Sequence, residues 1–320
     1  MDLLSLLRCP TCHGQLAERP AALRCDACER DYEVIHGIPD FRPNPPDRPR
    51  HGEFCLKIMD IWERSTYRDL FGLYHEGDET ALAHLWEEHE ERAPERGERR
   101  WAEMQAAAGA VGQTLRTDGF ALDLGCGIGS ALFALAPRAP LAVGLDIMLT
   151  DLLLAKKRFI EAGYGSVALV CASALELPFA DETFTLLNAT DVIEHMPDQP
   201  RFMAEARRVT SAGGCFFFNS PNRYSLFTRE PHVSLWGVGW LPRRWQALYV
   251  RWRLGRPYRG KRLLSSFELS RLTRRVFGRS YAVWPFVPRP GVAGLLLRAF
   301  GAIGAPLLPQ HNVLAWKPQT

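Results

Sequence analysis

The amino-acid sequence predicts an α/β fold, in which a largely parallel sheet carries helices on both faces and follows a small cysteine-rich module. Three observations carry this prediction. Two CxxC pairs stand near the start of the chain, an apolar run ending in Asp123 leads into a glycine-rich turn, and apolar runs then alternate with helical patterns. At 320 residues, with 47% hydrophobic and 23% charged residues, the chain is long enough for one large domain and a small one.

The N-terminal module is defined by four cysteines in the spacing CxxC-x12-CxxC: Cys9, Cys12, Cys25 and Cys28. Two such pairs can place four thiolates tetrahedrally around Zn²⁺. A pair of disulfides is the alternative, but the chain opens without a charged-then-apolar signal segment, which favours metal and a cytoplasmic, reducing location. A module of about 40 residues builds little core, so zinc would supply much of its folding free energy.

Residues 43–117 are expected to connect this module to the sheet. Four prolines between Pro43 and Arg50 predict a semi-rigid, extended linker. After the linker, Phe54, Ile58 and Ile61 recur at helical spacing, so the rest of the segment is expected to be mostly helical.

The glycine-rich turn has the geometry of a nucleotide-like ligand site. Gly125, Gly127 and Gly129 follow the strand that ends near Asp123, and a second strand ends at Asp146, 21 residues after Gly125. Glycines allow the backbone to approach the ligand, and an acid at the end of the second strand can accept hydrogen bonds from ribose hydroxyls. The spacing is GxGxG, without the last glycine of the dinucleotide fingerprint, and the acid before the turn suits a ligand with an amino group.

Five stretches together resemble the class I S-adenosylmethionine-dependent methyltransferases, and in particular the group that includes the ubiquinone-biosynthesis O-methyltransferases. They are Asp123–Gly129, Asp146, Leu177–Phe179, Asp191–His195 and Ala206–Gly214, within roughly residues 118–220. The resemblance implies a Rossmann-like seven-stranded sheet with a reversed last strand. It also implies that S-adenosylmethionine binds at the carboxyl ends of strands one to four.

The same resemblance implies which residues hold the cofactor. They come from the ends of successive strands: Asp123, Gly125, Gly127, Gly129, Asp146, Ser173, Ala174 and Asn188. One departure concerns adenine, because members of the family often have an acid that contacts the adenine amino group. This chain has Ala172, Ser173 and Ala174 there, so the Ser173 hydroxyl is the group left to form a hydrogen bond.

The end of the fourth strand carries the residues that are expected to act in catalysis. Asp191, Glu194 and His195 lie at i, i+3 and i+4, so one helical turn would bring them together near the methyl donor. Methyl transfer to a hydroxyl needs a base, and histidine suits that role near neutral pH. A similar Glu-x-x-Glu-His pattern in the ubiquinone-type enzymes is associated with a divalent metal, so Mg²⁺ binding is an alternative. A third interpretation is that His195 and Glu194 brace the loop by hydrogen bonds.

The segment Asp31–Asp40, after the last cysteine pair, resembles the small zinc-ribbon domains of the Trm112 type. Members of that group associate with methyltransferases or are fused to them. The resemblance implies a zinc ribbon over residues 1–42, which either recognises substrate or caps the fold. His13 and His36 are expected to be exposed polar residues, because four cysteines complete the ligand set.

Charge is divided unevenly along the chain. Residues 201–320 contain 20 Lys and Arg against 3 acids, which leaves 19 basic and 33 acidic residues before them, so the parts carry +17 and −14. Trp236–Leu254 interleaves Trp, Tyr and Arg. This composition suits an anionic membrane surface, and it also suits stacking on nucleic-acid bases. The alternative is that the basic part packs on the acidic part within the molecule.

Residues 118–320 are predicted to be the methyltransferase domain, with a basic and aromatic insertion at 222–264 and an apolar insertion at 286–310. The apolar insertion is too short and too broken for a transmembrane helix, and could line a hydrophobic pocket or touch a bilayer. The predicted localisation is therefore cytoplasmic, with peripheral attachment to the inner face of the membrane as an option.

Three classes of function stay open. The first is an O-methyltransferase for a small-molecule or lipid-linked acceptor. The second is an RNA methyltransferase that grips the backbone through the ribbon and the basic half. Asn188-Ala-Thr-Asp191 stands where amino-group methyltransferases have an Asn/Asp-Pro-Pro-aromatic motif, which argues against it. The third is a non-catalytic S-adenosylmethionine-binding partner protein. The sequence does not define the oligomeric state.

Overall fold

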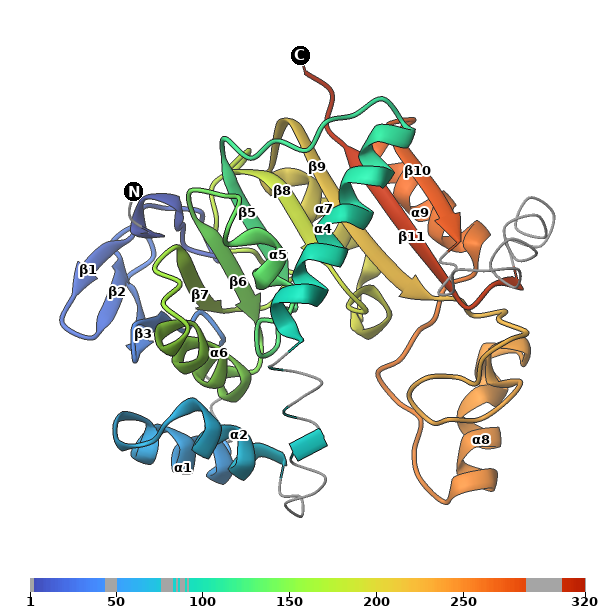
Figure 1. The fold of residues 1–320 in the computed structure, drawn as a ribbon, viewed down its shortest axis with the longest axis horizontal. Helices are drawn as coiled ribbons and strands as arrows, with labels where there is room; N and C mark the ends of the chain where they lie inside the picture. Colours follow the sequence, from blue (N-terminus) through green and yellow to red (C-terminus); the bar gives the residue numbers. More distant parts are fainter. Residues whose placement is uncertain are drawn as a thin grey trace.

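The computed structural model describes residues 3–43, 51–75, 83–84, 86, 90, 92–285 and 307–319. Its large sheet contains seven strands: β5 (Phe120–Leu124), β6 (Ala142–Asp146), β7 (Val167–Cys171), β8 (Phe184–Ala189), β9 (Thr210–Pro221), β10 (Tyr281–Pro285) and β11 (Gln310–Trp316). Their order is β10-β11-β9-β8-β5-β6-β7 (Figure 1). Strands β5 to β9 are parallel, and β11 is antiparallel to both β9 and β10. The predicted Rossmann-like sheet with a reversed last strand is confirmed.

The central strands are buried on both faces because their side chains are apolar on both sides. Every residue of β8 is buried, and so are the three consecutive residues Phe216, Phe217 and Phe218 of β9. Continuous apolar runs of this kind are typical of parallel strands covered by helices on each side. One face packs on α7 (Gln199–Val209) and α9 (Ser266–Phe277), and the other packs on α4 (Ala93–Ala110), α5 (Leu132–Leu135) and α6 (Leu149–Glu161).

The cysteine module forms a four-stranded antiparallel sheet that lies against the edge strand β7 (Figure 1). Its strands are β1 (Ala17–Arg19), β2 (Ala22–Cys25), β3 (Arg30–Ile35) and β4 (Ile38–Pro39), preceded by the 3-10 turn η1 (Leu3–Leu6). The Phe41 N–H donates to the Cys171 carbonyl at 2.7 Å, and the Arg8 N–H donates to the Pro178 carbonyl at 2.9 Å. Leu6 and Leu7 belong to the same apolar cluster as the large sheet, so the ribbon-like module is packed onto the core.

Three helical elements precede α4 in the described part of the linker segment. They are α1 (Glu53–Ile61), η2 (Trp62–Arg64) and α2 (Tyr67–His75). The Trp62 indole N–H donates to the Leu153 carbonyl at 2.9 Å, and the Tyr74 hydroxyl donates to Asp151 at 3.1 Å, so both contacts reach α6. The prolines 45, 46 and 49 of the predicted linker lie outside the described residues.

Residues 222–264 form a lobe that projects from the carboxyl end of β9 (Figure 1). It contains η5 (Val238–Trp240) and α8 (Arg243–Leu254). Its own apolar core has only three buried residues, Val233, Val238 and Val250. Most of the predicted apolar insertion, residues 286–306, lies outside the described residues, and among the described helices none is long and apolar enough to cross a membrane.

Candidate cofactor and active site

A cavity of about 570 Å³ opens at the carboxyl ends of β5, β6, β7 and β8. Its lining includes Gly125, Asp146, Ser173, Asp191 and His195. Parallel strands end at one edge of a sheet, so residues that are far apart in sequence meet there. The structure thus brings part of each predicted set to one hollow: Gly125, Asp146, Ser173 and Ala174 of the predicted cofactor residues, and Asp191 and His195 of the predicted catalytic residues. The other predicted residues are not in its lining: Asp123, Gly127, Gly129, Asn188 and Glu194.

The three glycines of the turn serve two different purposes. All three have positive φ, of +68° at Gly125, +51° at Gly127 and +84° at Gly129. A Cβ at Gly125 would lie 2.5 Å from Cγ2 of Val192, and one at Gly129 would lie 2.5 Å from Cε2 of Phe159. At Gly127 the nearest atom is Oδ2 of Asp151, at 4.0 Å. Two glycines therefore allow close packing within the protein, whereas Gly127 leaves space beside the turn.

Asp123 is a buried acid with half of its carboxylate unpartnered. Its side chain is at the end of β5, only 2% exposed, and Oδ1 accepts a hydrogen bond from the Asn188 amide at 2.7 Å. Oδ2 has no partner among the described residues. Burial raises the pKa of Asp123 to about 7. A ligand with an ammonium group would supply both the missing hydrogen bond and the missing opposite charge.

Arg100 joins this pair from α4, and the sequence analysis missed it. Its guanidinium donates to Oδ1 of Asn188 at 3.1 Å and to the Thr190 hydroxyl at 2.8 Å, and it lies 4.3 Å from the Phe217 ring centroid. Its Nε is buried without a partner in the described structure. A cationic residue beside the ammonium site is suited to the carboxylate of an amino-acid ligand.

Asp146 is held at the end of β6 by two backbone N–H groups. Oδ2 accepts from Gly127 and Oδ1 accepts from Met148, each at 2.9 Å. A carboxylate offers about four lone-pair positions, so two remain for a ligand. The position agrees with the predicted ribose contact, which stays a prediction.

The far wall of the cavity is apolar. Ile147 and Met148 are each 53% exposed, and Ser173 and Ala174 also line the cavity. The Ser173 hydroxyl accepts a hydrogen bond from the Leu175 N–H at 3.2 Å, so it already closes a local turn. A flat aromatic ligand would cover these side chains.

The predicted catalytic residues do not share one helical turn. Ile193–His195 form a short 3-10 turn, η4, and Asp191 precedes it with φ of +55°. The Asp191 carboxylate accepts from the Gln310 amide at 2.9 Å, and burial raises its pKa. Glu194 and His195 meet His232 of the lobe instead, with ligand atoms within 4.8 Å of one another.

His195 has a partner at each ring nitrogen. Nδ1 lies 2.7 Å from the Lys261 ammonium, and Nε2 lies 3.2 Å from Nε2 of His232. Burial first, and then the positive charge of Lys261, lowers the pKa of His195 to about 4, so the ring is neutral at pH 7. With Lys261 donating to Nδ1, the proton of the neutral ring is on Nε2 and points to His232.

The chain of contacts continues from His232 to a buried acid. Nδ1 of His232 lies 2.6 Å from Oε1 of Glu230, which also accepts from the Tyr258 hydroxyl at 3.2 Å. Lys261, His195, His232 and Glu230 thus form one continuous series of hydrogen bonds. Beside it, both carboxylate oxygens of the buried Glu194 lack a described partner, and burial raises the pKa of Glu194 to about 7.

Two groups of side chains among the described residues could hold a metal ion. The Sγ atoms of Cys9, Cys12, Cys25 and Cys28 all lie within 4.8 Å of one another, with 3.6 Å between Cys9 and Cys28 and 3.4 Å between Cys12 and Cys25. Sulfurs about 2.3 Å from a tetrahedral zinc ion would be roughly 3.8 Å apart, so this set fits Zn²⁺.

The prediction that both histidines are exposed holds for His13 and is wrong for His36, which is half-buried because its ring stacks on Trp62. The donor set of the second group does not match the Mg²⁺ alternative. His13 is exposed, and His36 stacks on Trp62 with 4.5 Å between ring centroids, away from the sulfurs. Glu194, His195 and His232 offer two imidazoles and one carboxylate. Mg²⁺ prefers an all-oxygen shell, so this donor set does not match it.

Comparison with known proteins agrees with this site. Residues 122–218 match the methyltransferase domain family. A demethylmenaquinone methyltransferase of Bacillus velezensis is 35% identical over 112 residues, which cover 33% of this chain and 48% of the relative. A ubiquinone biosynthesis O-methyltransferase of Paracidovorax citrulli is 33% identical over 107 residues, which cover 32% of this chain and 43% of the relative. The matched stretches thus span less than half of each relative.

A solved structure, that of the YcgJ protein from Bacillus subtilis, covers 70% of this chain and all of its own, with 17% identity and a TM-score of 0.46. Residues 122–218, which match a methyltransferase domain, hold the glycine turn, Asp146 and the catalytic candidates, and the relatives that align there are named as methyltransferases. The ribbon-like module lies before the matched residues and the lobe lies after them.

Proposed function

We propose that this protein transfers the methyl group of S-adenosylmethionine to a hydroxyl of a small-molecule or lipid-linked acceptor. The observation that carries the proposal is the unpartnered, buried Oδ2 of Asp123 beside a glycine turn and a cavity of about 570 Å³. Two of the relatives are named as quinone methyltransferases, which supports a small, apolar acceptor.

Different residues of the chain would bind different parts of the cofactor. Asp123 would accept a hydrogen bond from the amino group, with Arg100 facing the carboxylate. Asp146 would accept from the ribose, and Ile147 and Met148 would cover adenine. When bound, the cofactor supplies an activated methyl group on sulfur. The residues fix its position, so that the acceptor oxygen can form the new C–O bond in line as the C–S bond breaks.

The proton of the acceptor hydroxyl is assigned to the hydrogen-bonded series. His195 is neutral at pH 7, and it can accept a proton at Nδ1 once Lys261 releases that nitrogen. Its Nε2 proton then passes to His232, and the Nδ1 proton of His232 passes to Glu230. The proton ends on a buried carboxylate, away from the newly formed ether.

Zn²⁺ is proposed as a structural ion in the ribbon, held by Cys9, Cys12, Cys25 and Cys28. Gly14 stands beside this set, and a Cβ there would lie 3.3 Å from both Cys12 Sγ and Cys25 Sγ. The absence of a side chain at Gly14 lets the backbone pass close to the sulfurs, as a closed four-thiolate zinc site requires.

The test uses S-adenosylmethionine labelled in its methyl group. The protein is incubated with this cofactor and a cell extract, and the lipid, small-molecule, RNA and protein fractions are counted, with Asp123→Ala as the control. We expect label in the lipid or small-molecule fraction. Label in RNA would establish an RNA methyltransferase instead, and tight cofactor binding without any label transfer would identify a non-catalytic binding protein.

A further inference from the structure

Exposed apolar side chains are concentrated in the lobe. Of the thirteen large apolar residues that are exposed in the described structure, eight belong to residues 222–264: Leu226, Phe227, Trp236, Trp240, Trp245, Leu248, Trp252 and Leu254. Four of them are tryptophans. A concentration of exposed apolar side chains in one part of a protein marks a surface that binds a partner.

Helix α8 turns its most apolar ridge outward. Trp245, Leu248 and Trp252 lie at i, i+3 and i+7, so they share one face, and they are 51%, 66% and 77% exposed. Gln246 and Val250 are buried on the opposite face. The helix therefore packs on the lobe with one side and presents an unpartnered apolar ridge with the other.

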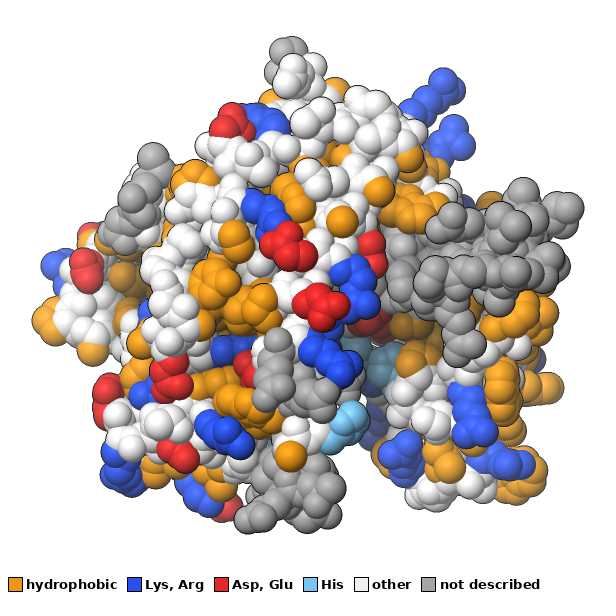
Figure 2. Space-filling view, in the orientation of Figure 1, with side chains coloured by type: hydrophobic (Ala, Val, Ile, Leu, Met, Phe, Trp, Pro, Cys, Tyr) orange, Lys and Arg blue, Asp and Glu red, His pale blue; other side chains and the backbone are white. Residues whose placement is uncertain are grey.

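Arginines border this ridge. Residues 222–264 contain ten Lys and Arg against one acid, Glu230. Arg244 and Arg251 lie on one side of the ridge by helical spacing, and Arg253 lies on the other. Figure 2 shows basic and hydrophobic side chains next to one another over the lobe, at the lower right.

Within the described residues, no salt bridge joins the positive charge of the lobe to the acidic N-terminal part. In the described residues the lobe's arginines form salt bridges only through Arg223 and Arg243, and both reach Glu268. Intramolecular pairing with the first 200 residues, the alternative considered above, is not found in that part of the chain. The lobe keeps its charge for an anionic partner.

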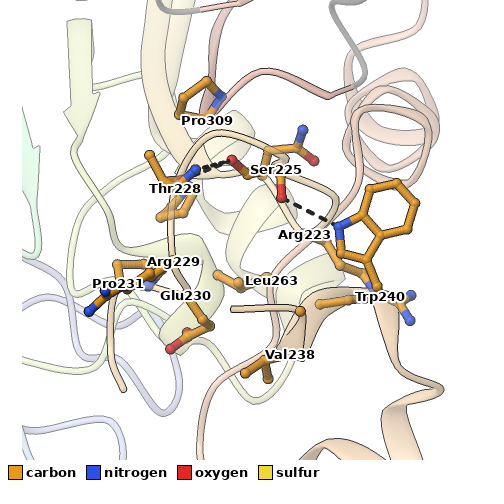
Figure 3. Close-up of a pocket in the computed structure, with 14 residues that line it drawn as sticks. Arg223, Ser225, Thr228, Arg229, Glu230, Pro231, Val238, Trp240, Leu263 and Pro309 are labelled. Atoms are coloured by element: carbon orange, nitrogen blue, oxygen red, sulfur yellow. Dashed lines mark hydrogen bonds between the residues drawn. The ribbon is translucent and has the colours of Figure 1, made fainter. Parts of the chain in front are cut away.

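The base of the lobe is hydrogen-bonded to the segment that leads into β11, because the Asn222 N–H donates to the Pro309 carbonyl at 2.8 Å, and further hydrogen bonds lie within the lobe. Arg223 donates to the Gly239 carbonyl at 2.8 Å, and the Trp240 indole donates to the Ser225 carbonyl at 3.3 Å (Figure 3). The hollow that Figure 3 shows between them has a volume of only about 20 Å³, enough for one water and not for a larger ligand. The lobe's partner must therefore bind to its outer surface.

We propose that the outer face of α8 docks the protein on an anionic lipid bilayer. Trp245, Leu248 and Trp252 enter the headgroup region, and Arg244, Arg251 and Arg253 contact lipid phosphates. A membrane fits this face better than RNA does, because Leu248 is aliphatic and offers no ring for stacking, yet it is the centre of the ridge.

Docking would also bring the candidate active site to the lipid surface, a point that rests on the proposed function. His232 and Lys261 belong to the lobe and contact His195 at 3.2 and 2.7 Å. The lobe that would touch the bilayer through α8 is thus also the lobe that contacts His195, a residue of the cavity lining. A lipid-linked acceptor could reach His195 without leaving the interface.

The full-length protein is tested by co-sedimentation with vesicles of phosphatidylcholine alone and of phosphatidylcholine with 30% phosphatidylglycerol. We expect binding to the anionic vesicles only. Arg244→Gln with Arg251→Gln, and separately Trp245→Ser with Trp252→Ser, should each weaken binding by about tenfold or more. Matched controls come from exposed residues of α9: Arg274→Gln with Arg275→Gln, and Phe267→Ser. They should bind as the unchanged protein does.

Thermal unfolding and calorimetry of S-adenosylmethionine binding check that every variant is folded. No binding to anionic vesicles, or binding that both lobe double variants retain, overturns the proposal. Salt-sensitive binding to bulk transfer RNA without vesicle binding overturns it in favour of an RNA surface. Vesicle binding by a protein that labels no acceptor would retain the docking and reject the proposed function. Label transfer without vesicle binding would retain the proposed function and reject the docking.

Discussion

The ribbon and the lobe are both additions to the same sheet, but the ribbon buries apolar side chains against the sheet, whereas the lobe exposes many of its own. Leu6 and Leu7 of the ribbon are buried in the core of the large sheet. The lobe buries three valines and exposes four tryptophans. The difference indicates that the ribbon is built to stabilise and the lobe is built to bind.

The two additions also touch opposite ends of the cavity. The guanidinium of Arg42, the last residue of the ribbon, donates to the Ile147 carbonyl at 3.3 Å, on the wall assigned to adenine. The lobe reaches His195 through His232 and Lys261, on the wall assigned to the acceptor. We therefore expect changes in the ribbon to alter stability and cofactor binding, and changes in the lobe to alter chemistry and docking.

The largest expected effect is on the lobe side of this comparison. His195→Gln keeps hydrogen bonding but removes the base, so kcat should fall by about 10²–10⁴-fold with little change in cofactor affinity. His232→Gln should lower kcat by a smaller factor, because it interrupts the series only after the first proton transfer. Steady-state kinetics with the true acceptor measure both. Near-normal turnover of the His195 variant would show that the ring only braces the loop.

Next in size is the loss of the metal on the ribbon side. Cys25→Ser should remove the single zinc ion expected per chain and lower the free energy of unfolding by more than about 3 kcal/mol. Metal analysis and denaturant unfolding are the measurements. Trp252→Ala is the matched change in the lobe and should shift stability by about 0.5 kcal/mol or less, since the side chain is 77% exposed. Equal losses in the two variants would break the comparison.

A smaller effect is expected at the glycine turn of the cavity, which belongs to neither the ribbon nor the lobe. Gly127→Ala should lower cofactor affinity by about tenfold or more, because the added Cβ would occupy space left beside the turn. The positive φ of residue 127 should also make the alanine cost about 1–2 kcal/mol of folding stability. Gly112→Ala is the control: its φ is +69° and nothing lies within 4 Å of a Cβ there. It should cost similar stability without changing the affinity measured by calorimetry.

The smallest effect is a pH dependence of cofactor binding. Burial raises the pKa of Asp123 to about 7, so in the free protein the group is increasingly protonated below that pH and cannot pair with an ammonium group. Affinity should therefore fall by about tenfold between pH 8 and pH 6. The same group adds folding stability at low pH and loses it as pH rises through about 7. Calorimetry in buffers of different ionisation enthalpy should detect proton release at pH 6.5, and its absence would contradict the assignment.

Local patterns were enough to predict the sheet and the edge at which the cavity opens. Asp123, the glycines and Asp146 lie at strand ends, and strand ends can be read from apolar runs that stop at polar residues. The prediction that Asp191 shares a helical turn with Glu194 and His195 was wrong, because the turn after β8 is a short 3-10 turn that excludes Asp191. Helical spacing predicts neighbours only when a helix forms.

The remaining site residues have no local signal. His232 is 37 residues from His195, and Arg100 is 88 residues from Asn188. Each is one charged or polar residue among many in its own segment, and only the packing of the lobe and of α4 brings it to the cavity. Sequence periodicity describes which face of an element is apolar, and it does not describe which elements meet.

We expect the contact between Arg42 and the Ile147 carbonyl to link the binding of the two proposed ligands, Zn²⁺ and S-adenosylmethionine. A metal that keeps the ribbon in its docked shape also keeps Arg42 on the cofactor wall. Linkage is reciprocal, so any factor by which zinc strengthens cofactor binding is also the factor by which the cofactor strengthens zinc binding. The protein would then hold its metal most firmly when the methyl donor is plentiful, and release it most readily when the donor is scarce.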